Sequence, residues 1–267
     1  TLIEAVHADY FAAGADIALT ASYQATFAGF GARGIDADAT RGLLQLAVDL
    51  AARARDRHLA GSPAAANRPL PLIGASIGAF GAHRHDGSEY RGDYGVSAAT
   101  IGDFHRRQVE VLAAAGADFI AFETIPCRLE IEAILRLLED FPGIPAWISF
   151  SCRNGEQNSH GEDFGDCVAL VAESPSVIAT GINCTAPEFV ESLLRTARTR
   201  CTLPLFAYPN SGETWHAQSG CWHGNASAGS LSAEVRRWLA AGATLLGGCC
   251  RTTPADIAEI ARAIRGG

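Results

Sequence analysis

Short apolar runs rich in β-branched and aromatic residues alternate along the chain with longer stretches of helical periodicity. The short runs predict buried strands, and the longer amphipathic stretches predict helices. The predicted strands are Asp16–Ser22, Leu70–Ser76, Asp118–Glu123, Ala146–Ser151, Val177–Asn183, Leu205–Tyr208 and Thr244–Gly248. The predicted helices are Leu2–Ala13, Ala39–His58, Ala98–Ala115, Arg128–Asp140, Asp163–Ala172, Pro187–Ala197, Ala233–Ala241 and Pro254–Ile264. This alternation indicates right-handed βαβ units and a parallel sheet.

Two α/β folds fit this pattern, an open doubly wound sheet and a closed (βα)8 TIM-type barrel. No Gly-x-Gly-x-x-Gly motif follows the early strands, which disfavours a dinucleotide-binding domain. The segment Ala-Gly-Ala-Asp ends two predicted helices, at Ala13–Asp16 and Ala115–Asp118, as in a repeated unit. We therefore predict a single barrel domain over residues 1–267. Its first strand is expected to be missing from these residues, which leaves a gap between Asp16–Ser22 and Thr244–Gly248.

The composition of the chain excludes several classes of partner and of catalytic chemistry. Hydrophobic residues make up 48% and charged residues 19% of the chain, as in ordinary globular proteins. The net charge of −8 is spread without blocks of like charge, and no apolar run approaches the length of a membrane-spanning helix. We expect neither nucleic acid nor membrane as a partner. All 21 basic residues are Arg. Schiff-base, pyridoxal-phosphate and P-loop chemistry each need a lysine and are excluded for these residues.

The ends of three predicted strands share a second pattern. Glu123-Thr-Ile-Pro126, Cys184-Thr-Ala-Pro187 and Cys250-Arg-Thr-Thr-Pro254 each begin with a residue capable of chemistry. The Thr that follows is expected to cap the next helix, and the Pro fits the first helical turn. In a βα-barrel the carboxyl ends of all strands open onto the face that carries the active site.

Three of the eight cysteines are predicted to converge at this face. Gly247-Gly-Cys-Cys250 ends the last strand, and Gly181-Ile-Asn-Cys184 ends the strand two before it. Three thiolates with an open fourth position form a reactive rather than a structural zinc site. Neighbouring cysteines on a strand point to opposite sides, so Cys249 and Cys250 can share a metal only where the backbone turns. Gly247 and Gly248 supply the dihedral freedom and the close approach for such a turn.

These cysteines and glycines have alternative interpretations. Free Cys behaves as a small hydrophobe, and this is our interpretation of the remaining cysteines: Cys127, Cys152, Cys167, Cys201 and Cys221. Gly247–Gly248 could instead form a phosphate-binding turn, although two thiols are a poor choice beside an anion. Clustered cysteines in a long chain point to a reducing cytoplasm, where metal binding or catalysis is commoner than disulfides.

The cysteine motifs resemble those of the homocysteine S-methyltransferase family. Four further segments are similar to the family: Ala21-Ser-Tyr-Gln-Ala-Thr26, Tyr90-Arg-Gly-Asp-Tyr-Gly95, Phe122-Glu-Thr-Ile-Pro126 and Tyr208-Pro-Asn-Ser-Gly-Glu213. The resemblance covers essentially the whole chain. It implies a βα-barrel in which Cys184, Cys249 and Cys250 bind Zn²⁺. It also implies transfer of a methyl group from a sulfonium donor, S-methylmethionine or S-adenosylmethionine, to homocysteine. Family members begin with a strand bearing an Asp-Gly-Gly turn, and this chain starts after that turn.

Other strand-end residues are candidates for binding these small-molecule substrates. Glu123 could take the ammonium of homocysteine, Asn183 and Ser22 could donate or accept hydrogen bonds, and the segment Tyr90–Tyr94 could hold a sulfonium by cation–π attraction. Two alternative functions remain open at this point. One is a zinc hydrolase on the same barrel, although such enzymes favour His and carboxylate ligands. The other is a non-catalytic zinc-binding or ligand-sensing barrel.

Overall fold

Strands and helices alternate along the chain as the apolar pattern predicts. The computed structural model describes residues 1–61, 68–216, 221–223 and 231–266. The parallel strands are β1 (Ile17–Leu19), β2 (Leu72–Gly78), β3 (Phe119–Ile125), β4 (Ala146–Phe150), β5 (Val177–Asn183), β6 (Leu205–Tyr208) and β9 (Ala243–Leu246). The longer helices are α1 (Leu2–Ala12), α3 (Ala37–Gly61), α4 (Ala98–Ala114), α5 (Arg128–Glu139), α6 (Phe164–Ala172), α7 (Pro187–Arg200), α8 (Leu231–Ala240) and α9 (Pro254–Arg265).

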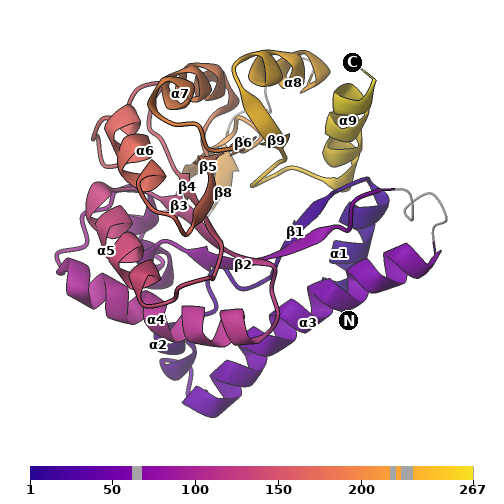
Figure 1. The fold of residues 1–267 in the computed structure, drawn as a ribbon. Helices are drawn as coiled ribbons and strands as arrows, with labels where there is room; N and C mark the ends of the chain where they lie inside the picture. Colours follow the sequence, from indigo (N-terminus) through magenta and orange to yellow (C-terminus); the bar gives the residue numbers. More distant parts are fainter. Residues whose placement is uncertain (62–67, 217–220, 224–230, 267) are drawn as a thin grey trace.

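The strands form one curled sheet in the order β1-β2-β3-β4-β5-β6-β9, and every neighbouring pair is parallel. Each parallel strand therefore lies beside the next parallel strand along the chain, with the helices around the outside (Figure 1). A doubly wound sheet reverses its strand order at a switch point, and this sheet does not. The α/β class and the parallel sheet are confirmed, and the doubly wound alternative is wrong.

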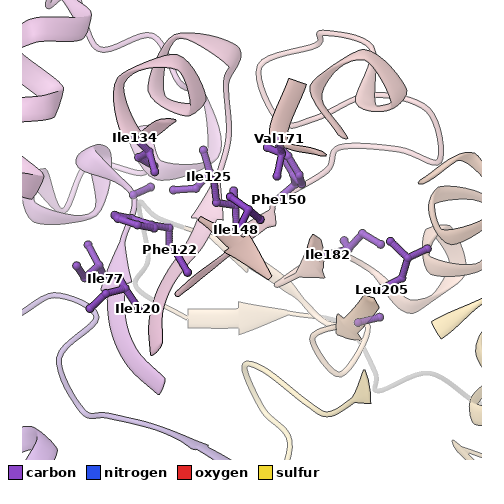
Figure 2. Close-up of a cluster of buried hydrophobic side chains, with 14 of the residues drawn as sticks. Ile77, Ile120, Phe122, Ile125, Ile134, Ile148, Phe150, Val171, Ile182 and Leu205 are labelled. Atoms are coloured by element: carbon purple, nitrogen blue, oxygen red, sulfur yellow. The ribbon is translucent and has the colours of Figure 1, made fainter. Parts of the chain in front are cut away.

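Successive side chains on each strand point to opposite faces of the sheet, and the two faces have different contents. Outward-facing residues such as Ile120, Phe122 and Ile148 pack against the helices in the main hydrophobic core (Figure 2). Inward-facing residues from neighbouring strands, including Phe119 and Trp147, form a second buried cluster. Because both faces are buried, the strands read as continuous apolar runs.

Gly181 on β5 makes room inside the curled sheet. A Cβ atom at this position would lie 2.0 Å from the backbone oxygen of Phe206 and 2.6 Å from its ring. The neighbouring strand can therefore pack its Phe206 ring into the interior only because residue 181 has no side chain.

The outer edges of the sheet belong to β1 and β9. Among the described residues nothing pairs with either edge, so the sheet stays open between them, as the sequence predicts. A largely apolar groove of about 650 Å³ runs between these edges, lined by residues such as Val6, Leu19 and Ile264. Helix α1 packs against α3, and α9 packs against α8 on the other side of the groove. No described helix is long and apolar enough to cross a membrane.

The apolar pattern did not predict several shorter elements. They are the helix α2 (Phe27–Gly31), the 3₁₀ turns η2 (Phe80–Arg84) and η3 (Ser88–Tyr90), and an antiparallel hairpin of β7 (Thr214–His216) and β8 (Cys221–His223). Each is five residues or shorter, too short to show a period. Cys127, Cys152 and Cys167 are buried as predicted, whereas Cys201 is half-buried and Cys221 is exposed, so the interpretation of Cys221 as a buried hydrophobe is wrong.

Replacing Gly181 by Ala should lower the free energy of unfolding by at least about 2 kcal/mol, because the added methyl overpacks the sheet interior. Gly42→Ala is the matched control. It adds the same methyl to an exposed position of α3 with no atom within 4 Å, and it should raise stability by roughly 0.5–1 kcal/mol through helix propensity. Urea unfolding of both variants measures the difference; equal stabilities would contradict the packing argument.

Candidate metal and substrate site

Cys184 lies directly after β5, where the chain turns sharply. Its backbone adopts a left-handed conformation with φ of 45°, and its N–H donates to the Tyr208 oxygen at 3.2 Å. Pro187 then occupies the start of α7. The turn therefore ends the strand at Cys184 and leaves the thiol on the rim, half-buried.

Cys249 and Cys250 follow β9 in a loop that is fastened to the loop after β6. The Cys249 N–H donates to the Pro209 oxygen at 2.8 Å, and the Cys250 oxygen accepts from the Ser211 N–H at 3.1 Å. Gly248 permits a close approach, because a Cβ there would lie 2.4 Å from Thr252 Oγ1.

The expectation that glycine dihedrals produce this turn is wrong. Neither Gly247 nor Gly248 has a positive φ. The left-handed residues at the two cysteine motifs are Cys184 and Arg251, with φ of 45° and 68°. The strain of these two conformations is carried by non-glycine residues, as is common where a functional geometry is imposed.

The three sulfurs converge on one point. Cys184 Sγ lies 2.6 Å from Cys249 Sγ and 3.3 Å from Cys250 Sγ, and the last two are 4.0 Å apart. Three thiolates at about 2.3 Å from a tetrahedral Zn²⁺ would be roughly 3.8 Å apart. The cluster is thus slightly tighter than a zinc site, and small side-chain rotations would open it to that size. Among the described residues this is the single group of three or more Cys, His or carboxylate side chains that could hold a metal ion.

The cluster favours one thiolate even before a metal binds. Hydrogen bonds from the Cys184 thiol and then from the Cys249 thiol lower the pKa of Cys250 to about 3. Hydrogen bonds of the Cys249 thiol to Cys184 and to Cys250, together with burial, raise the pKa of Cys249. One negative charge is therefore shared over three sulfurs at neutral pH, and only a bound cation would stabilise three.

Glu123 ends the inward-facing row of β3 beside the cysteines. Its Oε1 accepts from the Tyr208 hydroxyl at 2.9 Å, and its Oε2 accepts from the Ser76 hydroxyl. Burial raises the pKa of Glu123 to about 7, although these two hydrogen bonds oppose the rise. A carboxylate that is 6% exposed and has no cationic partner among the described residues is suited to receive a cation.

The structure places Ser22 and Asn183 on the same rim, but their polar atoms are already engaged. Ser22 Oγ donates to the Ser76 oxygen at 2.6 Å and lies 2.6 Å from Thr20 Oγ1. Asn183 uses both ends of its amide on Thr124, at 2.8 Å each. Direct substrate contact by Ser22 and Asn183 stays a prediction.

Two of the three Thr residues expected to cap helices do not. The residue that caps α5 is Cys127 and the one that caps α7 is Ala186. Thr124 lies within β3 instead. Only Thr253 caps its helix, α9, where it forms a capping box with Asp256.

Two tyrosines, Tyr23 and Tyr90, lie close enough to the cysteines to feel their charge. Burial, and then the negative charge on Cys184, raises the pKa of Tyr90. Burial also raises the pKa of Tyr23, which is hydrogen-bonded to Thr124 and close enough to feel the charge on Cys184. Aromatic rings beside thiolates offer a place for a cation.

A buried carboxylate holds the segment that carries Tyr90. Glu130 of α5 accepts from the Phe80 N–H at 2.6 Å and from the Tyr94 hydroxyl at 2.6 Å, and it contacts His105 Nε2 at 2.8 Å. The segment is thus fastened on both sides of Tyr90. Sequence reasoning did not find Glu130, Ser76 or the interior role of Tyr208, because each acts through a partner far away in the chain.

Comparison with known proteins places this geometry in a family. The sequence model described as homocysteine S-methyltransferase matches residues 1–264. The chain belongs to the homocysteine S-methyltransferase family. The family resemblance drawn from the cysteine motifs is therefore confirmed.

Relatives of this family resemble the chain over nearly its whole length. The chain is 48% identical to the homocysteine S-methyltransferase YbgG of Bacillus subtilis over 97% of this chain and 82% of the relative. It is 48% identical to the homocysteine S-methyltransferase of Escherichia coli, covering 97% and 83%. The crystal structure of the metallated form of the Escherichia coli homocysteine methyltransferase MmuM superimposes with a TM-score of 0.87 at 46% identity, covering 97% of this chain and 83% of that one.

The shared charge in the cysteine cluster predicts how metal-free protein reacts with iodoacetamide. Because the pKa of Cys250 is about 3, its thiolate population should not change between pH 5 and 8, and its alkylation rate should stay nearly constant. Burial raises the pKa of Cys127 to about 12, so alkylation of that internal control should speed up with pH wherever it is detected. Peptide mapping by mass spectrometry measures both rates. A tenfold rise per pH unit at Cys250 would contradict the shared-charge description.

Proposed function

We propose that this family member transfers a methyl group from a sulfonium donor to the thiol of homocysteine, which gives methionine. The observation that carries the proposal is the convergence of three cysteine sulfurs beside a buried carboxylate on one rim of the sheet. Names of relatives support the acceptor: proteins 42–48% identical to this chain are named homocysteine S-methyltransferases.

We propose Zn²⁺ as the metal held by Cys184, Cys249 and Cys250. The three sulfurs supply the soft, anionic ligands that zinc favours, and they leave a fourth position for a substrate. A zinc ion bound there would keep the substrate thiol deprotonated at neutral pH. The metallated form described for MmuM supports a metal in this family, and the choice of zinc rests on the ligand set.

Glu123 is the residue we assign to the homocysteine ammonium. Its carboxylate is buried at the rim and is held by Ser76 and Tyr208, and the part of the chain that the structure describes offers it no positive partner. An ammonium would compensate the desolvated charge. This contact would fix the amino-acid end of homocysteine. The homocysteine sulfur would then occupy the open fourth position of the metal held by the three cysteines.

The donor is a cation, and the rim is arranged to attract one. Thiolate charge on the cysteines and the nearby rings of Tyr23 and Tyr90 favour a sulfonium over a neutral methyl donor. The leaving group is a neutral thioether, so no proton donor is needed. The chain's task is to hold acceptor sulfur and methyl carbon in line at about 3–3.5 Å. S-Methylmethionine and S-adenosylmethionine both meet this description.

The hydrolase alternative receives no support from the site. A zinc hydrolase favours His or carboxylate ligands and a general base for water, whereas the candidate metal group among the described residues contains only cysteines. A selenol is a second acceptor to test, because a Brassica relative 42% identical to this chain is named selenocysteine Se-methyltransferase.

We also propose that an eighth parallel strand closes the sheet into a (βα)8 barrel in the working enzyme. Open backbone edges on β1 and β9 face one apolar groove, where unpaired buried N–H and C=O groups would be costly. A reducing compartment such as the cytoplasm suits the three thiols, which must stay unoxidised to bind a metal.

The deciding experiment measures methionine. Purified protein loaded with zinc is incubated with homocysteine and with S-methylmethionine or S-adenosylmethionine separately. Selenocysteine then replaces homocysteine, and Se-methylselenocysteine is the product measured in that arm. Methionine formed with at least one donor supports the proposal. Zinc binding without turnover with any donor would favour the non-catalytic barrel.

Replacing Cys249 by Ser should remove the bound zinc and abolish methyl transfer, because a neutral hydroxyl replaces one of three thiolates. The fold should persist, since the residue lies on the rim outside the main core. Cys201→Ser is the control, a half-buried cysteine away from the cluster, and it should keep its zinc. Metal analysis measures the bound zinc, the methyl-transfer assay measures activity, and circular dichroism shows whether the fold persists. A Cys249→Ser protein with normal zinc would rule out this ligand.

Replacing Glu123 by Gln should remove a pH dependence of substrate binding. Glu123 is protonated below its pKa of about 7 and binds an ammonium only when ionised. In the parent protein KM for homocysteine should therefore fall about tenfold between pH 6 and pH 8. In Glu123→Gln it should be higher throughout and lack this component. Parallel KM profiles for the two proteins would show that Glu123 does not bind the ammonium.

A further inference from the structure

Asn183 reaches across the rim from β5 to β3. Its Oδ1 accepts from the Thr124 backbone N–H and its Nδ2 donates to Thr124 Oγ1, each at 2.8 Å. Both residues are 1% exposed, so these bonds are shielded from water. Ser151, directly after the intervening strand β4, adds a weaker contact, in which its hydroxyl donates to the Thr124 oxygen at 3.4 Å.

Thr124 adopts a conformation that its side chain disfavours. Its φ is 65°, in the left-handed region, where a β-branched residue is strained. Such a conformation persists only where surrounding contacts hold it. The amide of Asn183 makes two of the contacts available for that purpose.

The strained residue lies in a β-bulge between Phe122 and Ile125. Phe122 pairs with Ile148 and Ile125 pairs with Phe150, so three steps along β3 oppose two along β4. The bulge lets Ile125 return to the outer core beside Phe122. Glu123 thereby stays the last inward-facing residue before the turn, where its carboxylate meets Tyr208 and Ser76.

We propose that Asn183 is a positioning residue, which holds Thr124 in its left-handed conformation and so places Glu123 at a set separation from Cys184. This inference rests on the proposed function for the role of Glu123. Asn183 precedes Cys184 directly in the chain, so one side chain links the strand end that carries the carboxylate to the strand end that carries a sulfur. The distance between acceptor ammonium and acceptor sulfur is set by that link.

The test uses glycine as a residue that adopts a positive φ without strain. Asn183→Ala should raise KM for homocysteine about tenfold and lower the unfolding temperature, because Thr124 is released. Thr124→Gly alone should have a smaller effect on KM. In Asn183→Ala/Thr124→Gly the glycine can keep the bulge without the amide. KM should then recover to within about threefold of the parent protein, and the unfolding temperature should rise above that of Asn183→Ala.

Asn158 provides a matched control for the loss of a buried amide. It is fully buried, and its side chain bonds Gly161 and Glu162 in a different loop. Thr124→Gly should not restore the unfolding temperature of Asn158→Ala. If it does, glycine at position 124 is a general stabiliser and the proposal fails.

Two further outcomes would overturn the positioning role of Asn183. Failure of Thr124→Gly to rescue KM would show that Asn183 contacts the substrate itself, and loss of zinc from Asn183→Ala would show that it acts through Cys184. Either result overturns the positioning role. A parent protein that does not methylate homocysteine overturns the proposed function instead, and the recovery of the unfolding temperature still tests the link between Asn183 and Thr124.

Discussion

The alternation of side chains along parallel strands is the constraint on which the candidate site depends. Inward-facing residues are apolar near the amino ends of the strands, as at Phe119 and Trp147. They are polar at the carboxyl ends, as at Glu123 and Asn183. Because the strands are parallel and follow one another in order, all of these ends meet on one rim. The rim is therefore a polar layer supported by an apolar one.

Charge at the rim is mostly negative. A carboxylate and three thiols lie close together, and the neighbouring cation, Arg251, pairs with Glu213 Oε2 at 3.0 Å. Like charges crowded in a buried place are stable only when protonated or when paired with cations. Burial is the main cause of the raised pKa of Glu123, and the charge on Cys250 adds to it. The crowding of negative groups explains why a metal ion, an ammonium and a sulfonium are the groups that such a site accommodates.

The rim is held in place by contacts that span the sheet rather than follow the chain. Tyr208 of β6 bonds Glu123 of β3, and the loop after β9 is fastened to the loop after β6. On the outer side, Glu130 fastens the segment that carries Tyr90. Reactive groups are thus placed by a network of buried polar groups, in which each hydrogen bond is strengthened by the exclusion of water.

The sequence alone determined the repeated units of the fold and the cysteines of the site. Apolar runs at regular spacing indicated the seven parallel strands, and the paired motifs ending at Cys184 and Cys250 indicated one shared rim, because strand ends in such a fold must meet. Tertiary structure decided what no local pattern contains. Thr124 adopts a left-handed conformation and makes two hydrogen bonds with Asn183, 59 residues away, and no local pattern in the sequence indicates either feature. The raised pKa of Glu123 likewise arises from burial beneath distant strands, since a carboxyl in an isolated segment would be fully hydrated.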